Sequence, residues 1–288
     1  MTSDLRPLLV ASRAGLSRGR IELRQGFTNA ETLWGYLLPT VVLLVVMFFA
    51  RDATVPGTDF SLGGQMLPSS LGMLVAFGGL ATVAAIIATE REDGTLLRAK
   101  ATPNGMLGYL ISRIVVVAGM GLVSSALLLV PGSFLLDGLM LGNPVAWLTL
   151  AGVLVLGMVA TMPIGAVLGS LLSNPREVGL VTLPIMGLVA ISGIFYPVTV
   201  MPGWVQGLAQ VFPVYWLGLG MRSALLPDAM AAVELGGSWR HLETLLVLGG
   251  WAVAGLALAP VALRRMARRE SGASVAARRE KAMQRVTW

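Results

Sequence analysis

The sequence predicts an all-α membrane protein with six transmembrane helices, and composition and segment length both lead to this fold class. The 288 residues are 55% hydrophobic and only 12% charged, with a mean hydropathy of +0.77, which is too apolar for a water-soluble domain. Six stretches reach the roughly 20 apolar residues that a membrane-crossing helix needs. They cover residues 33–50, 67–89, 107–136, 147–172, 178–195 and 245–263. We expect one helical bundle over residues 33–263.

The segments outside these stretches predict two further features. Residues 1–32 mix five arginines with apolar side chains, which favours an amphipathic helix on the membrane surface over a solvated basic arm. Residues 196–222 are apolar but contain Pro197, Pro202 and Pro213. Non-helical backbone at membrane depth has to be covered by protein, so we expect a re-entrant helical hairpin there. The third stretch is long enough to tilt or to break, and Pro131 near its end favours a break.

The basic residues predict the orientation. Of the 21 lysines and arginines, 18 lie on one side: in segment 1–32, in the loop after the second span with Arg113 close by, in the turn at Arg176 and in the tail 264–288. The opposite side holds only Arg51, Arg222 and Arg240. Basic loops stay on the inner side of a membrane, so both termini are expected in the cytoplasm. We expect the chain in the plasma membrane, as a protein of a bacterial inner membrane.

Several kinds of chemistry are disfavoured by what the sequence lacks. The second, fourth, fifth and sixth spans have no ionisable residue in their interiors, whereas ion-coupled carriers need such groups. Arg113 and Asp137, at the two ends of the third span, are expected to reach the membrane surface. There is no cysteine and one histidine, His241, so neither a metal site nor a catalytic residue is predicted, and an intramembrane hydrolase is a poor alternative.

The chain also lacks the lysine of a phosphate-binding loop. That loop ends in Gly-Lys-Ser or Gly-Lys-Thr, whereas Lys100 and Lys281 are each followed by alanine. Active transport would therefore take its energy from another polypeptide, which would also hold the ATP and magnesium. No cofactor is expected in this chain.

The loop 89–106 is the most informative segment. It begins with acidic residues and ends with basic ones, which suits a short helix capped by Thr89 or Asp93 and stopped by Pro103. A soluble partner can hold such a helix at the foot of two spans. A solvated loop that only fixes the topology is the alternative.

Two motifs carry a resemblance to a known family. The segment from Glu90 to Leu96 with the following Pro103 resembles the cytoplasmic loop of ABC-2 type permeases, the membrane subunits of ATP-binding-cassette exporters. The segment 192–222, with Gly193, its prolines and Arg222, is similar to the family's stretch before the last span. Within the family, the chain looks most like daunorubicin-resistance-like drug exporter permeases.

The resemblance implies roles for particular residues. The loop would form a coupling helix against a separate ATPase, with an N-terminal arginine such as Arg24 pairing near Glu90, and with Leu96 or Leu97 as an apolar knob. The coupling residues would be Glu90, Arg91, Glu92, Gly94, Thr95, Leu96 and Arg98. An extracellular gate would contain Tyr196, Pro197, Pro202, Trp204 and Pro213. We expect Trp204, Tyr215 and Trp216 to be aromatic residues at the membrane surface.

The resemblance further implies a substrate path between two permease copies, lined by spans two and five. The candidate residues are Met73, Phe77, Leu80, Met186, Ala190 and Phe195, for which ordinary helix packing is the alternative. Gly165 and Gly169 form a GxxxG pair that predicts a helix contact.

The expected function is that of a permease subunit of an ATP-driven exporter, a homodimer in membrane lipid that moves an amphiphilic or lipophilic drug, antibiotic or lipid. A membrane scaffold or sensor without transport and an exporter of lipid-linked glycans are alternatives. Nucleic acid is not an expected partner, because the basic tail adjoins a membrane exit.

Overall fold

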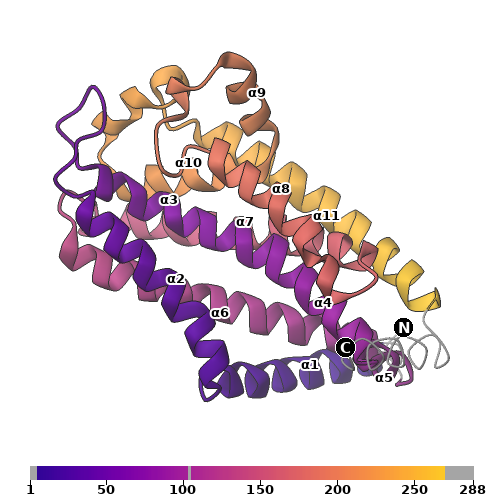
Figure 1. Cartoon of the computed structure of the whole chain (residues 1–288). Coiled ribbons are helices and arrows are strands. Elements are labelled where there is room, and N and C mark those ends of the chain that lie inside the picture. The colour runs from indigo at the N-terminus through magenta and orange to yellow at the C-terminus, as the bar shows by residue number, and fades with distance from the viewer. Residues whose placement is uncertain (1–4, 103–104, 270–288) are drawn as a thin grey trace, which may run out of the picture.

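The computed structural model describes residues 5–102 and 105–269, and they form a bundle of helices (Figure 1). The only β interaction in the described part is an isolated bridge between Thr54 and Ser61. Five helices in this part are long and apolar enough to cross a membrane, which confirms the all-α membrane class. They are Ala30–Phe49, Leu62–Glu92, Gly105–Leu135, Pro144–Leu171 and His241–Arg268.

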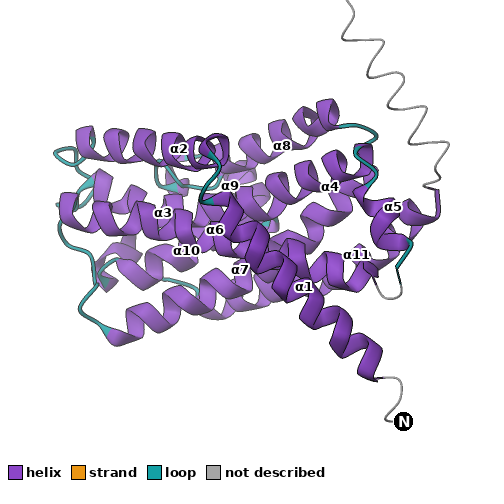
Figure 2. Cartoon of the chain, turned by 90° about the horizontal axis from the view of Figure 1, so that it is seen from below, coloured by secondary structure: helices purple, strands orange, loops and turns teal. Residues whose placement is uncertain are grey.

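The first two helices are joined by a short turn in which Asn29 caps the second helix. Helix α1 (Leu5–Gly26) confirms that the arginine-rich N-terminal segment is helical, and Figure 2 shows it crossing the bundle obliquely. Helix α2 (Ala30–Phe49) begins at Asn29, whose side chain accepts a hydrogen bond from the Thr32 amide at 3.1 Å. Such capping satisfies an otherwise unpaired backbone donor. The helix therefore starts three residues before its apolar stretch.

The second span changes its winding in the middle. Helix α3 (Leu62–Phe77) continues through a π-helical turn, η1 (Gly78–Thr82), into α4 (Val83–Glu92). At Gly79 a Cβ atom would lie 1.9 Å from the Thr161 hydroxyl oxygen, so only glycine fits against α7. The π turn thus lies where the second span packs closely against α7.

The third and fourth spans are continuous helices. Helix α6 (Gly105–Leu135) passes through Pro131, so the predicted break is wrong. Membrane helices tolerate an internal proline when neighbouring groups take up the freed backbone bond. Helix α7 (Pro144–Leu171) begins with proline at its first position, after the capping Asn143.

The GxxxG pair of α7 makes the contact that the sequence predicts. A Cβ atom at Gly165 would lie 2.0 Å from the Gly79 carbonyl oxygen, and one at Gly169 would lie 2.8 Å from the Ala84 Cα. These distances leave no room for a larger side chain. The small residues therefore let α7 pack directly against the second span.

The fifth apolar stretch forms a shorter helix than expected. A 3-10 turn, η2 (Pro175–Glu177), leads into α8 (Val178–Ile191), which has 14 residues. Its end comes four residues early because Gly193, with φ of +73°, turns the chain. By length α8 is below the threshold that the five other spans meet, so six spans remain a prediction.

The proline-rich segment forms two helices at a sharp corner. After η3 (Val198–Val200) come α9 (Gly203–Val211) and α10 (Pro213–Leu225). Helix α10 is buried against α3, α7 and α11, and it contains Tyr215 and Trp216. The prediction that these two aromatic residues lie at the membrane surface is wrong, because they form part of the core. Trp204 is exposed.

The last described helix is a long apolar one near the C-terminus. Two short turns, η4 (Asp228–Val233) and η5 (Leu235–Gly237), precede α11 (His241–Arg269), which packs against α7. The small helix α5 (Thr95–Lys100) lies at the other end of the bundle from α9 (Figure 1). Pro103 and the tail from residue 270 lie outside the described residues.

Candidate coupling site

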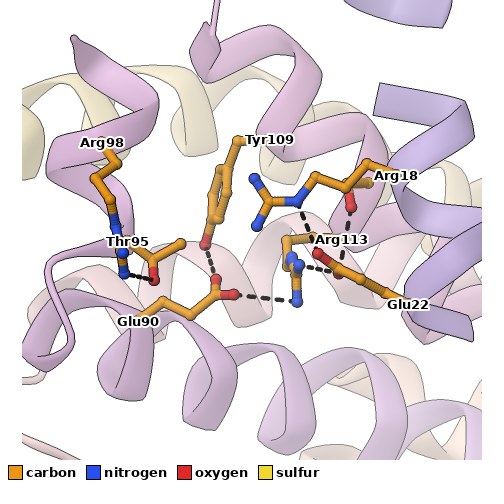
Figure 3. A network of polar contacts seen from close by, with 8 residues as sticks. Arg18, Glu22, Glu90, Thr95, Arg98, Tyr109 and Arg113 are labelled. Carbon is orange, nitrogen blue, oxygen red and sulfur yellow. Dashed lines mark hydrogen bonds and ion pairs between the residues drawn. The ribbon is translucent and has the colours of Figure 1, made fainter. Parts of the chain in front are cut away.

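A network of charged side chains joins α1, α4 and α6 beside α5 (Figure 3). The Glu90 carboxylate accepts a hydrogen bond from the Tyr109 hydroxyl at 2.5 Å and pairs with Arg113 at 3.1 Å. Arg113 also pairs with Glu22 of α1. Arg18 donates to the other oxygen of Glu22 at 2.7 Å. One guanidinium thus bridges two carboxylates from two different helices.

The close packing of α1 on α6 brings Glu22 to this network. Ala11, Gly15 and Gly19 recur every four residues on one face of α1. A Cβ at Gly15 would lie 2.5 Å from the Gly108 carbonyl oxygen. Small residues at this spacing allow two backbones to approach closely. Glu22 lies on the same face and therefore points at α6.

The charges of the network balance. Glu22 and Glu90 are matched by Arg18 and Arg113, and the side chains of Glu90 and Arg113 are only 13% and 16% exposed. A buried charge is costly unless it is paired, and removing one partner leaves the other uncompensated. The network therefore holds the three helices in one arrangement as long as all members are present.

A glycine turn connects the network to α5. Helix α4 ends at Glu92, and Gly94 has φ of +76°, the left-handed conformation that commonly ends a helix. Thr95 then starts α5, and its hydroxyl accepts a hydrogen bond from Arg98 at 3.3 Å. The predicted single helix of the loop is thus two elements, with Glu90 in the last turn of a span and not in the short helix.

The remaining residues that the sequence predicts for coupling have different surroundings. Arg91 donates to the Leu172 carbonyl at 2.6 Å, which ties α4 to the end of α7. Leu96 is buried in a cluster with Ile87, Tyr109 and Met266, so it anchors α5 to its own chain. Arg98 is exposed and Glu92 is half-buried. The outer surface of α5 is therefore basic at Arg98.

One expectation about arginines is corrected. The residue that pairs with Glu90 is Arg113 of α6, whereas Arg24 takes no part in the described network, and α1 reaches the network through Glu22, which also pairs with Arg18. The Arg113 guanidinium lies between the two carboxylates, and its position relative to the membrane surface stays a prediction. Glu22, Tyr109 and Arg113 were not among the predicted site residues.

A signal for these residues is nevertheless present in the sequence. Glu22 is the only acid between Arg6 and Arg24, and Arg113 is the only charge within the third span. A lone acid in an arginine-rich helix and a lone arginine in an apolar span have opposite signs, which favours a pair between them. Periodicity alone does not reveal which helix of the bundle α1 contacts.

A second polar cluster lies at the other end of the bundle. Arg222 of α10 pairs with both oxygens of Glu234, at 2.6 and 3.1 Å, and its other terminal nitrogen donates to the Ser69 hydroxyl and the Gly193 carbonyl. The side chains of Arg222 and Glu234 are 1% and 3% exposed. We call it the outer cluster because it lies at the end of the bundle opposite α5. It fastens α10 to α3 and to the turn after α8.

The predicted gate residues surround this outer cluster. Tyr196 donates to the Ala190 carbonyl at 2.5 Å and thereby folds the turn back on α8. Pro197 is buried, Pro202 is exposed just before α9, and Pro213 is the buried first residue of α10. The structure thus places the five residues around one turn and the α9–α10 corner.

The predicted path residues lie on different kinds of surface. Met73 and Phe77 are half-buried neighbours on α3, and Leu80 is buried in η1. On α8, Met186 and Ala190 are exposed, as is Phe195 beyond its end. These three side chains are free of contacts that would bury them within one copy of the chain.

The comparison with protein families agrees with this architecture. The family model of the ABC-2 family transporter proteins matches residues 52–260, which is most of the chain. The chain belongs to the ABC-2 family and is a multi-pass membrane component of an ABC transporter. The match covers the loop, α5 and the outer cluster, whereas α1 and α2 lie outside it. No curated protein matches the chain significantly.

Proposed function

We propose that this chain is the permease subunit of an ATP-binding-cassette exporter, and that a separate ATPase drives it through α5. The observation that carries the proposal is the position of α5. It directly follows the network in which Glu90 and Arg113 join three helices, so a force on α5 reaches those helices through Gly94 and Leu96. Family membership supports an ATPase as the kind of partner.

The proposed topology has α5 in the cytoplasm. The excess of basic residues on this side, including Arg98 and the four arginines at the end of α11, supports that orientation. We propose that α8 is the sixth span, because with its flanking turns it runs beside α4. The α9–α10 corner would then be the re-entrant hairpin, and Trp204 would face the outer membrane surface.

The proposed coupling uses residues in two ways. Glu90, Arg91, Gly94 and Leu96 fix α5 to the spans, since their contacts lie within the chain. Arg98, with Glu92 and Thr95 nearby, would face the ATPase, where an exposed guanidinium forms charge-assisted bonds with acidic groups. ATP and magnesium would bind to that partner.

The proposed substrate path lies between two copies of the chain. The exposed Met186, Ala190 and Phe195 support a homodimer contact or a path at this face, because flexible apolar side chains accommodate varied apolar ligands. Met73, Phe77 and Leu80 would line its other wall. The scarcity of charge in the spans favours an amphiphilic or lipophilic substrate, such as a drug, antibiotic or lipid.

Charge reversal on α5 tests the proposal. The chain would be purified with its ATPase, reconstituted in vesicles, and assayed for substrate-stimulated ATP hydrolysis and export. Arg98→Glu is expected to abolish both by repelling the partner, while Arg51→Glu, an exposed reversal at the opposite end, leaves them intact. Full export by the Arg98 variant would contradict the proposed contact. An intact complex that never transports would favour the scaffold alternative.

A further inference from the structure

A cavity of about 450 Å³ lies between α4, α6, α7 and α11. Sites for small molecules commonly measure about 300–1,000 Å³. Helix α6 lines it from Tyr109 to Leu122, and α11 lines it from Leu256 to Leu263. None of the residues of the proposed substrate path or gate lines this cavity, so it is a separate site.

The cavity is elongated and has one polar end. Tyr109 and Leu122 are 13 residues apart on α6, which corresponds to about 20 Å along the helix axis. Tyr109 and Arg113 are near the inner end, and every other lining residue is apolar. This shape suits a single alkyl chain with a polar group at one end.

An unpaired donor lies at the polar end. The Nε–H of Arg113 is buried and has no hydrogen-bond partner among the described residues, although the terminal nitrogens of the same side chain are paired. A buried donor without an acceptor is costly. An acceptor oxygen on a ligand, such as an ester carbonyl, would satisfy it.

Positive charge continues beyond the polar end. Leu256 and Pro260 line the cavity, and Arg264 follows at the same spacing of four, so all three share one face of α11. Arg264 is exposed. Arginines just past the end of a membrane helix attract anionic lipid headgroups.

We propose that this cavity binds one acyl chain of an anionic phospholipid, with its ester oxygen at Arg113 and its phosphate at Arg264. An empty apolar cavity loses packing contacts along its walls, and the surrounding bilayer supplies chains of the right length. Because Tyr109 and Arg113 also hold Glu90, the lipid would support the network beside α5. The assignment to the inner leaflet rests on the proposed orientation, whereas binding itself does not.

Photolabelling tests the site without requiring transport. The full chain would be reconstituted in vesicles that contain phosphatidylglycerol with a photoactivatable acyl chain, and labelled peptides would be identified by mass spectrometry. We expect strong labelling of the cavity faces of α6, α7 and α11. Ala118→Trp is expected to lower it about tenfold, because the indole ring fills the cavity. Ala257→Trp, on an exposed part of α11, is the matched control and keeps full labelling.

The headgroup is tested with two adjacent arginines. Arg264→Gln is expected to remove the preference for phosphatidylglycerol over phosphatidylcholine, while Arg265→Gln, on another face of α11, retains it. Ala118→Leu replaces the tryptophan variant if the latter does not fold. Unchanged labelling in a folded cavity-filled variant would overturn the site. Equal labelling by both lipids in the unmodified chain would overturn the anionic headgroup.

Discussion

The two polar clusters of the bundle differ in how completely they are enclosed. At the outer cluster, Arg222 and Glu234 are almost fully buried, and the arginine makes four hydrogen bonds to three segments. In the network of Arg18, Glu22, Glu90, Tyr109 and Arg113 beside α5, which we call the inner network, Glu22 and Arg18 remain 23% and 48% exposed. The outer cluster is enclosed on all sides, whereas the inner network is partly exposed at its edge and adjoins α5, the helix through which we propose that the ATPase acts.

The largest expected effect comes from breaking the outer pair. Arg222→Gln or Glu234→Gln should destabilise the protein by about 3–5 kcal/mol, because the remaining charge is buried without its partner. Thermal unfolding in detergent measures the effect, with Arg51→Gln as the exposed control. The double variant should be more stable than either single one, and additive losses would show that the pair does not act as a unit.

Removing the Arg113 bridge of the inner network should lower the free energy of unfolding by a smaller amount. Arg113→Gln leaves Glu22 and Glu90 facing each other with partial access to water, so we expect a loss of about 1–3 kcal/mol. Arg113→Lys should recover little of this stability, since one ammonium group cannot pair with both carboxylates as the guanidinium does. A loss as large as that at Arg222 would remove the proposed difference between the clusters.

The packing of α1 on α6 provides a further comparison of the two clusters. Only the inner network depends on this packing, because Glu22 belongs to α1. A side chain at Gly15 meets the Gly108 backbone, so Gly15→Val should displace α1 at a cost of about 1–3 kcal/mol. Limited proteolysis of α1 reports the displacement. Gly35→Val on α2, where a Cβ meets nothing within 4 Å, is the matched control. Equal protease resistance in both variants would contradict the packing.

The smallest effect is expected at the turn before α5. Gly94→Ala forces an L-residue into the left-handed region, at a cost of about 1–2 kcal/mol. Gly78→Ala, which meets open space, is the control. We expect the Gly94 variant to lose substrate stimulation of the ATPase while its global unfolding temperature changes little. A fall in unfolding temperature comparable to that of the Arg222 variants would show that α5 is part of the rigid core.

The sequence predicts local features of the molecule better than its tertiary contacts. Apolar length and loop charge predict the membrane class and the positions of five spans, because these depend on the bilayer and on neighbouring residues. The family was predicted from the resemblance of the two motifs at Glu90–Leu96 and 192–222. Helix ends shifted where caps such as Asn29 extended α2 and where Gly193 shortened α8. Pro131 does not break α6, because a proline inside a membrane helix is tolerated when neighbouring groups take up the freed backbone bond.

The candidate site was predicted only in part, because its partners are distant in the chain. Glu90 was singled out from the loop, but its contacts come from residues 19 and 23 positions later and, through Arg113, from Glu22. Such pairing depends on which faces of the helices meet. The burial of Tyr215 and Trp216 was missed for the same reason, since an aromatic residue in a proline-rich loop resembles a surface anchor until α10 is placed in the core.

The number of substrate molecules exported per ATP hydrolysed tests the central claim most directly. It would be measured in vesicles for Glu90→Gln, Arg113→Gln and the double variant, each with the ATPase bound. If the inner network transmits the force on α5, both single variants lower this ratio and the double variant lowers it no further. An unchanged ratio in the single variants, with the complex intact, would show that coupling bypasses the network.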